Sequence, residues 1–228
     1  MKLRVVEIKA NIMRKNDALA ARLRERFAGA GTLAVNLLSS PGSGKTTLLE
    51  ETLRRLSAHR KVAALVGDQA TANDAERLQR SGAPVRQITT AAECRLDADM
   101  IEGALAGWEV GPLDALFVEN VGNLICPAEY DLGEDLRVVL FSVTEGEDKP
   151  LKYPLAFNTS QVVLVTKCDI ADAVGFNREA AHASLREVNP GIEIIELSAR
   201  TGEGMERWMA LLEGRIARKS AALALAPG

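Results

Sequence analysis

Residues 39–47, SSPGSGKTT, have the types and spacing of a loop that binds phosphate. They match the pattern G-x-x-x-x-G-K-S/T at Gly44, Lys45 and Thr46, with Ser39 in place of the first glycine. Glycines let backbone N–H groups turn towards phosphate oxygens, and a following helix N-terminus adds partial positive charge. The lysine reaches the β- and γ-phosphates, and the threonine hydroxyl coordinates Mg²⁺. We expect the phosphates of a nucleotide to be held by Pro41, Gly42, Ser43, Gly44, Lys45, Thr46 and Thr47.

Two later stretches, TKCD (166–169) and SAR (198–200), each stand at the end of an apolar run. They indicate which base of a nucleotide the protein would recognise. They resemble the N/T-K-x-D and S-A-K/R motifs of GTPases. A carboxylate at Asp169 can accept from N1–H and the exocyclic amine of guanine, whereas adenine would leave it unpaired at a cost of about 2 kcal/mol. The Lys167 stem would lie along the base, and the Ala199 N–H would meet the guanine oxygen. We expect GTP or GDP to be recognised by Lys167, Asp169, Ser198 and Ala199.

Acidic residues at other strand ends could hold magnesium and form a nucleotide switch. Glu119 ends the apolar run 113–119, and Gly122 is placed for its N–H to meet the γ-phosphate. Segments of this kind are ordered by GTP and released on hydrolysis. Asn123 stands where a water-orienting glutamine would be, so we expect slow hydrolysis unless a partner completes the site. The expected catalytic residues are Lys45, Asp68, Glu119 and Gly122, and the expected Mg²⁺ ligands are Thr46, Asp68, Asp74 and Glu119. Asp74 is explained as well by a helix N-terminus, which favours an acid in its first turn.

The elements that must position these residues alternate along the chain. Short apolar runs of strand length recur at 32–40, 61–67, 83–88, 113–119, 136–143, 161–166 and 192–198. Helical patterns fall at 11–28, 44–58, 72–81, 96–107, 177–188 and 204–218. Strands that are apolar on both faces and separated by helices indicate a mostly parallel sheet. We therefore predict an α/β P-loop NTPase of about seven strands with helices on both faces. Its parts are a helical extension (1–30), a GTPase domain (31–218) and a flexible tail (219–228).

Net charge, apolar runs and cysteine count indicate which kinds of partner and which cellular compartment to expect. The net charge of −3 gives no electrostatic case for nucleic-acid binding. No apolar run approaches the roughly 18 residues of a membrane span, and the charged N-terminus lacks the apolar core of a signal peptide. The three cysteines, Cys94, Cys126 and Cys168, form an odd count, which favours free thiols or a thiolate metal site in a reducing cytoplasm. We interpret Cys168, inside TKCD, as a packing residue.

Taken together, these stretches resemble the HypB GTPases, which help to insert nickel into nickel–iron hydrogenases. The resemblance runs over nearly the whole chain, and ENVGNLICPAEYDLG is its most specific part. The matching segments are KNDALA, SSPGSGKTT, GDQATANDAERL, ECRLDADMI, ENVGNLICPAEYDLGE, TEGEDKPLKYP, TKCD and SAR. The resemblance implies a homodimer formed on GTP binding, with the hydrogenase large subunit and nickel-delivery accessory proteins as partners. It also implies a metal site at the dimer interface, made from a Cys-His pair and a second cysteine.

This chain departs from that pattern at one position. Cys94 and Cys126 match the two cysteines, but Arg95 replaces the histidine. Arginine has no lone pair to donate, so it cannot be a ligand, although its charge should lower the pKa of the Cys94 thiol. The resemblance then implies a thiolate-dominated site for Ni²⁺ or Zn²⁺, with two cysteines from each chain of a dimer.

Three functions are compatible with these observations. The first is a GTP-hydrolysing metallochaperone for hydrogenase maturation. The second is a GTP-switched binding module that assembles with a nickel-delivery partner and binds no metal itself, a reading that Arg95 favours. The third is a urease-type or cobalamin-type accessory GTPase, against which ENVGNLICP argues.

Overall fold

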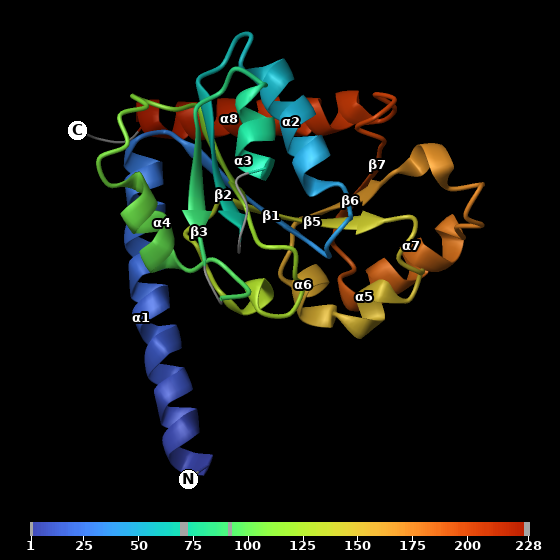
Figure 1. Cartoon of the computed structure of the whole chain (residues 1–228), viewed down its shortest axis with the longest axis horizontal. Helices are drawn as coiled ribbons and strands as arrows, with labels where there is room; N and C mark the ends of the chain where they lie inside the picture. The colour runs from blue at the N-terminus through green and yellow to red at the C-terminus, as the bar shows by residue number, and fades with distance from the viewer. Residues whose placement is uncertain (1, 69–72, 91–92, 226–228) are drawn as a thin grey trace.

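The computed structural model describes residues 2–68, 73–90 and 93–225 (Figure 1). Its centre is a seven-stranded sheet with the order β3-β2-β4-β1-β5-β6-β7, and all strand pairs are parallel. The strands are β1 (Leu33–Ser39), β2 (Val62–Asp68), β3 (Val85–Thr89), β4 (Ala115–Glu119), β5 (Leu136–Ser142), β6 (Val162–Thr166) and β7 (Glu193–Glu196). Each overlaps a run predicted from the sequence, although β2 and β3 end one residue beyond theirs, so the predicted parallel sheet and its number of strands are confirmed.

The strand order places the residues expected to bind nucleotide at one edge of the sheet. β1 lies between β4 and β5, and its partner strands advance in the same direction. Parallel strands end at the same edge, and open α/β sheets bind ligands there. The carboxyl ends of β1, β4 and β6 therefore lie along the same edge, with β5 between β1 and β6, although they are far apart in sequence.

Helices cover both faces of the sheet. They are α1 (Lys2–Gly29), α2 (Lys45–Leu56), α3 (Asn73–Gln79), α4 (Ala98–Leu105), α5 (Lys149–Lys152), α6 (Pro154–Asn158), α7 (Arg178–Val188) and α8 (Met205–Leu225), with short 3-10 turns η1 (Pro127–Glu129) and η2 (Cys168–Ile170). Because strand side chains alternate between faces, each strand supplies apolar residues to both layers. One core packs beneath α2, α3 and α8. On the opposite face, α1 and α4 cover one half of the sheet, and α6 and α7 cover the other.

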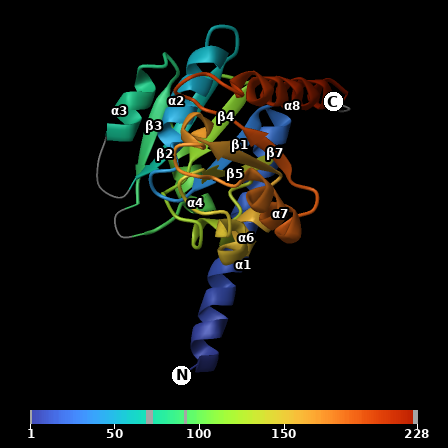
Figure 2. The same ribbon diagram turned by 90° about the vertical axis from the view of Figure 1, so that its right-hand side faces the viewer.

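Helix α1 is fastened to the body over its second half and projects from it over its first (Figures 1 and 2). Leu19, Leu23 and Phe27, which recur at helical spacing, are buried against α4. Ile12, one helical repeat earlier in the same pattern, is 49% exposed because the helix has left the body there. The buried Asn16 side chain donates to the Asp131 carbonyl at 2.9 Å and accepts from the Ala98 N–H at 3.0 Å.

Gly133, the last residue of the stretch ENVGNLICPAEYDLG, has a structural role in packing against α1. Its φ is +77°, and an added Cβ would lie 2.6 Å from the Ala20 carbonyl oxygen and 2.8 Å from the Leu23 Cβ. Only glycine suits that backbone conformation and that closeness. The Asp131 carboxylate, two residues earlier, accepts from the Arg24 guanidinium at 2.7 Å. This loop therefore anchors α1 and does not touch the nucleotide edge.

Two sequence expectations differ from the structure. The predicted flexible tail begins inside α8, which continues to Leu225, and Lys219 there pairs with Asp135 at 2.5 Å. Short helices α5 and α6 were missed because prolines at their first turns interrupt any long helical pattern. Within the described residues, no helix combines the length and the apolar character needed to cross a membrane.

Candidate nucleotide-binding site

The phosphate loop joins β1 to α2 and has the backbone that its glycines allow. Gly42 and Gly44 have φ of +76° and +90°, values that favour glycine. Gly44 immediately precedes α2, so the helix N-terminus opens directly onto the loop. Ser39, which replaces the first glycine of the pattern, is the last residue of β1 and is fully buried. A strand conformation needs no glycine, so this departure leaves the loop intact.

Three side chains expected at the phosphate and magnesium end lie together. Glu119 ends β4 and is 1% exposed. Its Oε1 atom accepts from the Thr46 hydroxyl at 2.7 Å and lies 3.5 Å from the Lys45 ammonium. Burial raises the pKa of Glu119, and the Lys45 charge and the Thr46 hydroxyl oppose that rise. The three groups, from β4 and the first turn of α2, form a polar cluster around the buried Glu119 carboxylate at the mouth of the loop.

The donor set at this cluster fits Mg²⁺. The other carboxylate oxygen of Glu119, Oε2, is buried and has no hydrogen-bond partner among the described residues. A buried oxygen without a partner is costly unless something satisfies it. Magnesium takes oxygen ligands from one or two protein groups together with water and phosphate oxygens. The hydroxyl of Thr46 and the carboxylate of Glu119 supply such ligands.

At the other end of the loop, the end of β6 is tied to the phosphate loop. Lys167 has φ of +62°, and its ammonium donates to the Gly42 carbonyl at 2.7 Å. The Thr166 hydroxyl donates to the Ser43 carbonyl, also at 2.7 Å. A lysine in the left-handed region costs about 1 kcal/mol, which these contacts help to offset. The TKCD stretch therefore abuts the phosphate loop.

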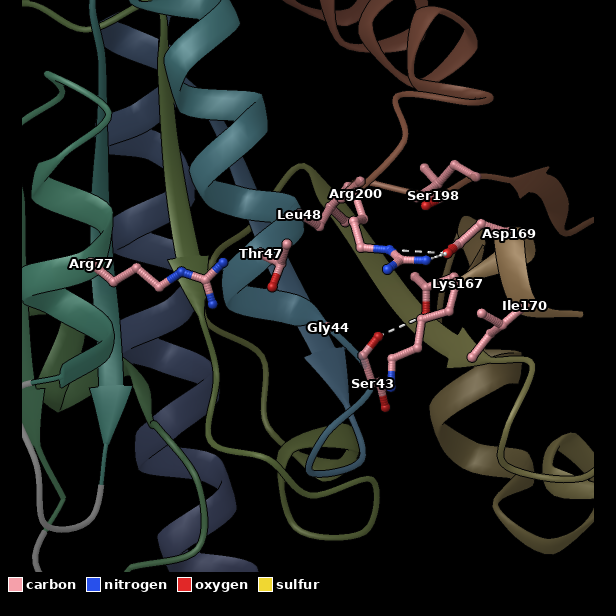
Figure 3. A pocket seen from close by; sticks show the side chains of 13 residues that line it. Ser43, Gly44, Thr47, Leu48, Arg77, Lys167, Asp169, Ile170, Ser198 and Arg200 are labelled. Carbon is pink, nitrogen blue, oxygen red and sulfur yellow. Dashed lines mark hydrogen bonds and ion pairs between the residues drawn. The ribbon is translucent and has the colours of Figure 1, made fainter. Parts of the chain in front are cut away.

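Asp169, expected to recognise guanine, is bound to an arginine in this structure (Figure 3). The Arg200 guanidinium donates two hydrogen bonds to its Oδ2 atom, at 2.5 and 3.1 Å. A hydrogen bond from Ser198 and then the Arg200 contact hold the pKa of Asp169 below its usual range. A guanidinium presents adjacent N–H donors of the kind that guanine offers at N1 and its exocyclic amine. Arg200 thus satisfies the carboxylate as guanine would.

Two adjoining hollows lie between the two ends of the site, and together they form the cleft. The hollow beside Asp169 measures about 510 Å³ and that over the phosphate loop about 550 Å³, and the two share Ser43, Gly44, Thr47 and Lys167 in their walls. The lining of the first includes Ser198 and Ala199. That of the second includes Pro41, Gly42, Lys45, Thr46, Asp74 and Gly122. Pockets of this size suit small ligands such as a nucleotide.

Asp68 differs from the other expected residues. It is the last residue of β2, at the correct edge of the sheet, and its side chain is partly exposed. Among the described residues it lines neither hollow, whereas Asp74, in the first turn of α3, does. The stretch between these two acids, residues 69–72, lies outside the described residues.

Gly122 and Asn123 connect the cluster at Glu119 to the cysteines. A Cβ on Gly122 would lie 3.2 Å from the Pro41 Cα, so glycine lets this backbone approach the phosphate loop. Asn123 pairs with Ser39 in an isolated antiparallel bridge. Its side-chain amide donates to the Cys94 carbonyl at 3.3 Å and accepts from the Ile125 N–H at 2.9 Å. Asn123 therefore contacts the end of β1 and the Cys94 backbone together.

Cys94 and Cys126 are brought together within one chain. Both are partly exposed free thiols. A hydrogen bond with Cys126, followed by burial, raises the pKa of the Cys94 thiol. Within the described residues, however, no group of three His, Cys, Asp or Glu side chains could hold a metal ion. One chain thus supplies two soft ligands, fewer than the four of a tetrahedral structural zinc site.

Arg95 is held by an aromatic ring and a carboxylate. Its guanidinium lies 4.0 Å from the centre of the Tyr130 ring and pairs with Glu93 at 2.6 Å. Its charge lowers the pKa of the Cys94 thiol, as expected, but the hydrogen bond with Cys126 and burial raise that pKa by more. The side chain is only 17% exposed, so it is held in place.

Cys168 packs in the core on the α7 face, as interpreted from the sequence. Its thiol donates to the Val165 carbonyl at 3.2 Å, and burial raises its pKa to about 11. A thiol with such a pKa is almost wholly protonated at neutral pH and is a poor ligand or nucleophile.

Sequence reasoning missed three charged residues at the cleft. Arg200 and Arg77 line it, and Glu145 accepts a hydrogen bond from the Ser43 hydroxyl in the phosphate loop. Glu145 also pairs with Lys149 at 3.3 Å. TEGEDKPLKYP, which contains both, carried family resemblance but no local chemical pattern that would have assigned it to the loop.

Comparison with known proteins agrees with this geometry. Residues 33–196 match the family described as CobW/HypB/UreG, nucleotide-binding domain. The chain is 50% identical over 210 residues to the hydrogenase maturation factor HypB of Escherichia coli K12, covering 92% of this chain and 72% of that protein. The crystal structure of hydrogenase maturation factor HypB from Archaeoglobus fulgidus superposes with a TM-score of 0.83 at 41% identity, covering 89% of this chain and 99% of that one. HypB from Helicobacter pylori, crystallised in complex with nickel, gives a TM-score of 0.85 at 37% identity and covers 90% and 97%.

Proposed function

Because this chain belongs to the HypB family of hydrogenase maturation factors, we propose that it is a GTP-hydrolysing metallochaperone that assists nickel insertion into hydrogenase. The observation that carries this proposal is the cleft from the Lys45–Glu119–Thr46 cluster to Asp169. A phosphate loop at one end and a carboxylate suited to guanine at the other match the two ends of GTP.

The residues of the cleft have complementary roles in this proposal. Lys45 stabilises the negative charge of the transferring phosphoryl group, and the Gly122 N–H contacts the γ-phosphate. Thr46 and Glu119, with Asp68 or Asp74, would hold Mg²⁺, which neutralises phosphate charge when bound. At the other end, Asp169 accepts from guanine after Arg200 releases it, while Lys167, Ser198 and Ala199 frame the base.

Hydrolysis by one chain should be slow. Asn123 follows Gly122, and its side-chain amide is engaged with the Cys94 carbonyl and the Ile125 N–H. It therefore does not replace a glutamine that orients the attacking water. A second copy of the chain, recruited when GTP binds, would complete the site.

The cysteine pair gives this dimer its cargo site. Cys94 and Cys126 each supply a soft ligand, and a two-fold axis would bring four thiols together. Such a set suits Ni²⁺ or Zn²⁺, and the H. pylori relative was crystallised with nickel. The physiological partners in this proposal are the hydrogenase large subunit and the accessory proteins that deliver nickel.

The test is the metal content and mass of the purified protein with GDP and with a non-hydrolysable GTP analogue. We expect a dimer with the analogue, about one metal ion per dimer, and competition for the nucleotide site by GTP but not ATP. A protein that ATP occupies as well as GTP would remove the guanine assignment. A protein that stays monomeric with both nucleotides would remove the proposed dimer site.

A second function is favoured by one observation. Arg95, whose guanidinium stacks on Tyr130, puts a positive charge at the position that follows Cys94 in the sequence. In this alternative the chain is a GTP-switched binding module that assembles with a nickel-delivery partner and binds no metal itself. A dimer that forms with the GTP analogue but contains no Ni²⁺ or Zn²⁺ after equilibrium dialysis would favour it.

A further inference from the structure

Arg77 belongs to neither the phosphate loop nor the guanine motifs, yet it lines both hollows of the cleft. It lies on α3, and Figure 3 shows its guanidinium directed towards Thr47 on α2. The Nε atom donates to a Glu50 carboxylate oxygen at 2.7 Å, and the side chains are 39% and 27% exposed. Arg77 is thus held at the wall of the cleft by a residue of the helix that begins at the phosphate loop.

The position of Arg77 along the cleft identifies the part of the nucleotide that it faces. Lys45 and Glu119 mark the end where the γ-phosphate and its metal would lie, and Asp169 marks the base. The residues shared by the two hollows, such as Thr47, mark the stretch between those ends. In a nucleoside triphosphate this middle stretch is the ribose and the α-phosphate.

The guanidinium is chemically suited to the α-phosphate. Arginine presents five N–H donors in a planar fork and keeps its charge at any physiological pH. Only Nε is used by Glu50, and within the described residues no acceptor is bound to the two terminal nitrogens. A phosphate oxygen matches such a pair of donors better than a neutral ribose hydroxyl does.

We propose that Arg77 is a nucleotide-binding residue that contacts the α-phosphate from α3, with Glu50 as the residue that positions it. The inference rests on the proposed function, because it assumes that a guanine nucleotide occupies the cleft. It assigns to Arg77 a ground-state contact that GTP, GDP and GMP all make. Every bound nucleotide would then fasten α3 to α2, whatever its number of phosphates.

The experiment compares Arg77→Ala with wild type in binding GDP, GMP and guanosine. Loss of an α-phosphate contact should weaken GDP and GMP about tenfold, equal to about 1.4 kcal/mol, and guanosine less than about twofold. Single-turnover hydrolysis of GTP is measured alongside, because loss of a contact made only with the γ-phosphate would lower that rate and leave GDP affinity unchanged. Arg77→Lys, which keeps the charge, should recover most of the lost affinity. Arg80→Ala is the matched control, since Arg80 is an exposed arginine just beyond the same helix.

Three results would overturn the inference. GDP affinity unchanged in Arg77→Ala would show that no contact exists. Equal weakening of GDP and guanosine would show a structural or ribose role. A large fall in the hydrolysis rate with normal GDP affinity would place Arg77 at the γ-phosphate. Failure of wild type to prefer guanine nucleotides would instead refute the proposed function, so the two failures are distinguishable.

Discussion

The nucleotide cleft and the cysteine pair are separated by a short stretch of chain. They differ in how many of the groups that a binding site needs are supplied by one chain. Glu119 and Cys126 lie at either end of one segment. At Glu119, the chain supplies a lysine, a hydroxyl and a buried carboxylate from two elements already in contact. At Cys126, it supplies one further thiol and, within the described residues, no third group able to bind metal.

The difference shows which function a single copy can perform. Nucleotide binding needs groups at the carboxyl ends of several strands, and a parallel sheet brings these together within one chain. A soft-metal site needs three or four ligands in a closed arrangement. Here half of such a set is present, so a metal site at these cysteines would need a second copy, whereas the nucleotide cleft would not.

The largest expected effect is on GTP hydrolysis, when the phosphate end of the nucleotide cleft is disrupted. Lys45→Ala removes the charge that pairs with Glu119 and stabilises the transferring phosphoryl group, so GTP hydrolysis should fall about a hundredfold or more. Steady-state phosphate release measures this fall. Lys61→Ala, which removes an exposed lysine before β2 at the opposite edge of the sheet, is the control. A mutant rate within about threefold of wild type would mean that this loop is not catalytic.

The next effect tests the base end of the same cleft. Asp169→Asn replaces an acceptor-only carboxylate by an amide that can donate, so GTP should bind about 30-fold more weakly, equal to about 2 kcal/mol. Xanthosine triphosphate, which offers a carbonyl in place of the amine, should bind better than it does to wild type. Competition against a fluorescent guanine nucleotide gives both numbers. If xanthosine and guanosine triphosphates change in parallel, Asp169 does not read the base.

The sheet and the phosphate end of the nucleotide cleft could be predicted from the sequence, because the patterns that indicate them are short and local. Apolar runs gave each strand, and the loop pattern placed Lys45 and Thr46 at the start of a helix. Glu119 could be expected opposite them because it ends a neighbouring strand of a parallel sheet. The sequence alone does not say that these residues meet in space. That expectation came from the general rule that the carboxyl ends of parallel strands share one edge of the sheet.

Contacts between distant side chains could not be predicted in the same way. Arg200 reaches Asp169 across 31 positions, and Ser43 reaches Glu145 across 102. No periodicity or short motif records such pairs, since each depends on a rotamer and on the packing of separate elements. Arg95 is a further case, because no short motif predicts its stacking on Tyr130.

A smaller effect tests whether the cysteine pair can be completed. Arg95→His should raise the affinity of the dimer for Ni²⁺ or Zn²⁺ about tenfold, or about 1.4 kcal/mol, because imidazole is a donor and the guanidinium charge is removed. Cys126→Ser should abolish binding in both backgrounds. Metal titration at fixed pH and nucleotide state gives the comparison, with Cys168→Ser as the cysteine control. If Arg95→His has no effect and Cys126→Ser is harmless, the cysteines are structural and the metal-free switch is the better account.

Metal uptake should also depend on pH. Hydrogen bonding to Cys126 and burial raise the pKa of Cys94, so the thiol holds its proton through neutral pH. Metal must displace that proton, and affinity should therefore increase as pH rises towards the raised pKa. Titrations at several pH values between about 6 and 8.5 measure the slope. Affinity that does not change over this range would show that the Cys94 thiol is not a ligand.

The smallest expected effect lies between the two sites, at Asn123. Its backbone bridges Ser39 at the end of β1, and its amide holds both the Cys94 carbonyl and the Ile125 N–H, next to Cys126. A nucleotide-dependent shift at Gly122 would therefore be passed to both cysteines. Asn123→Ala removes two hydrogen bonds but neither thiol, and each bond contributes about 1 kcal/mol at most to the coupling.

The measurement is the ratio of metal affinities with the GTP analogue and with GDP. We expect Asn123→Ala to reduce that ratio about threefold while nucleotide affinity stays near that of wild type. Asn158→Ala, at an exposed asparagine that ends α6, should leave the ratio unchanged. If the ratio is the same in wild type and Asn123→Ala, the coupling does not pass through this side chain. If it is already one in wild type, the cleft and the cysteine pair act independently despite their closeness in the chain.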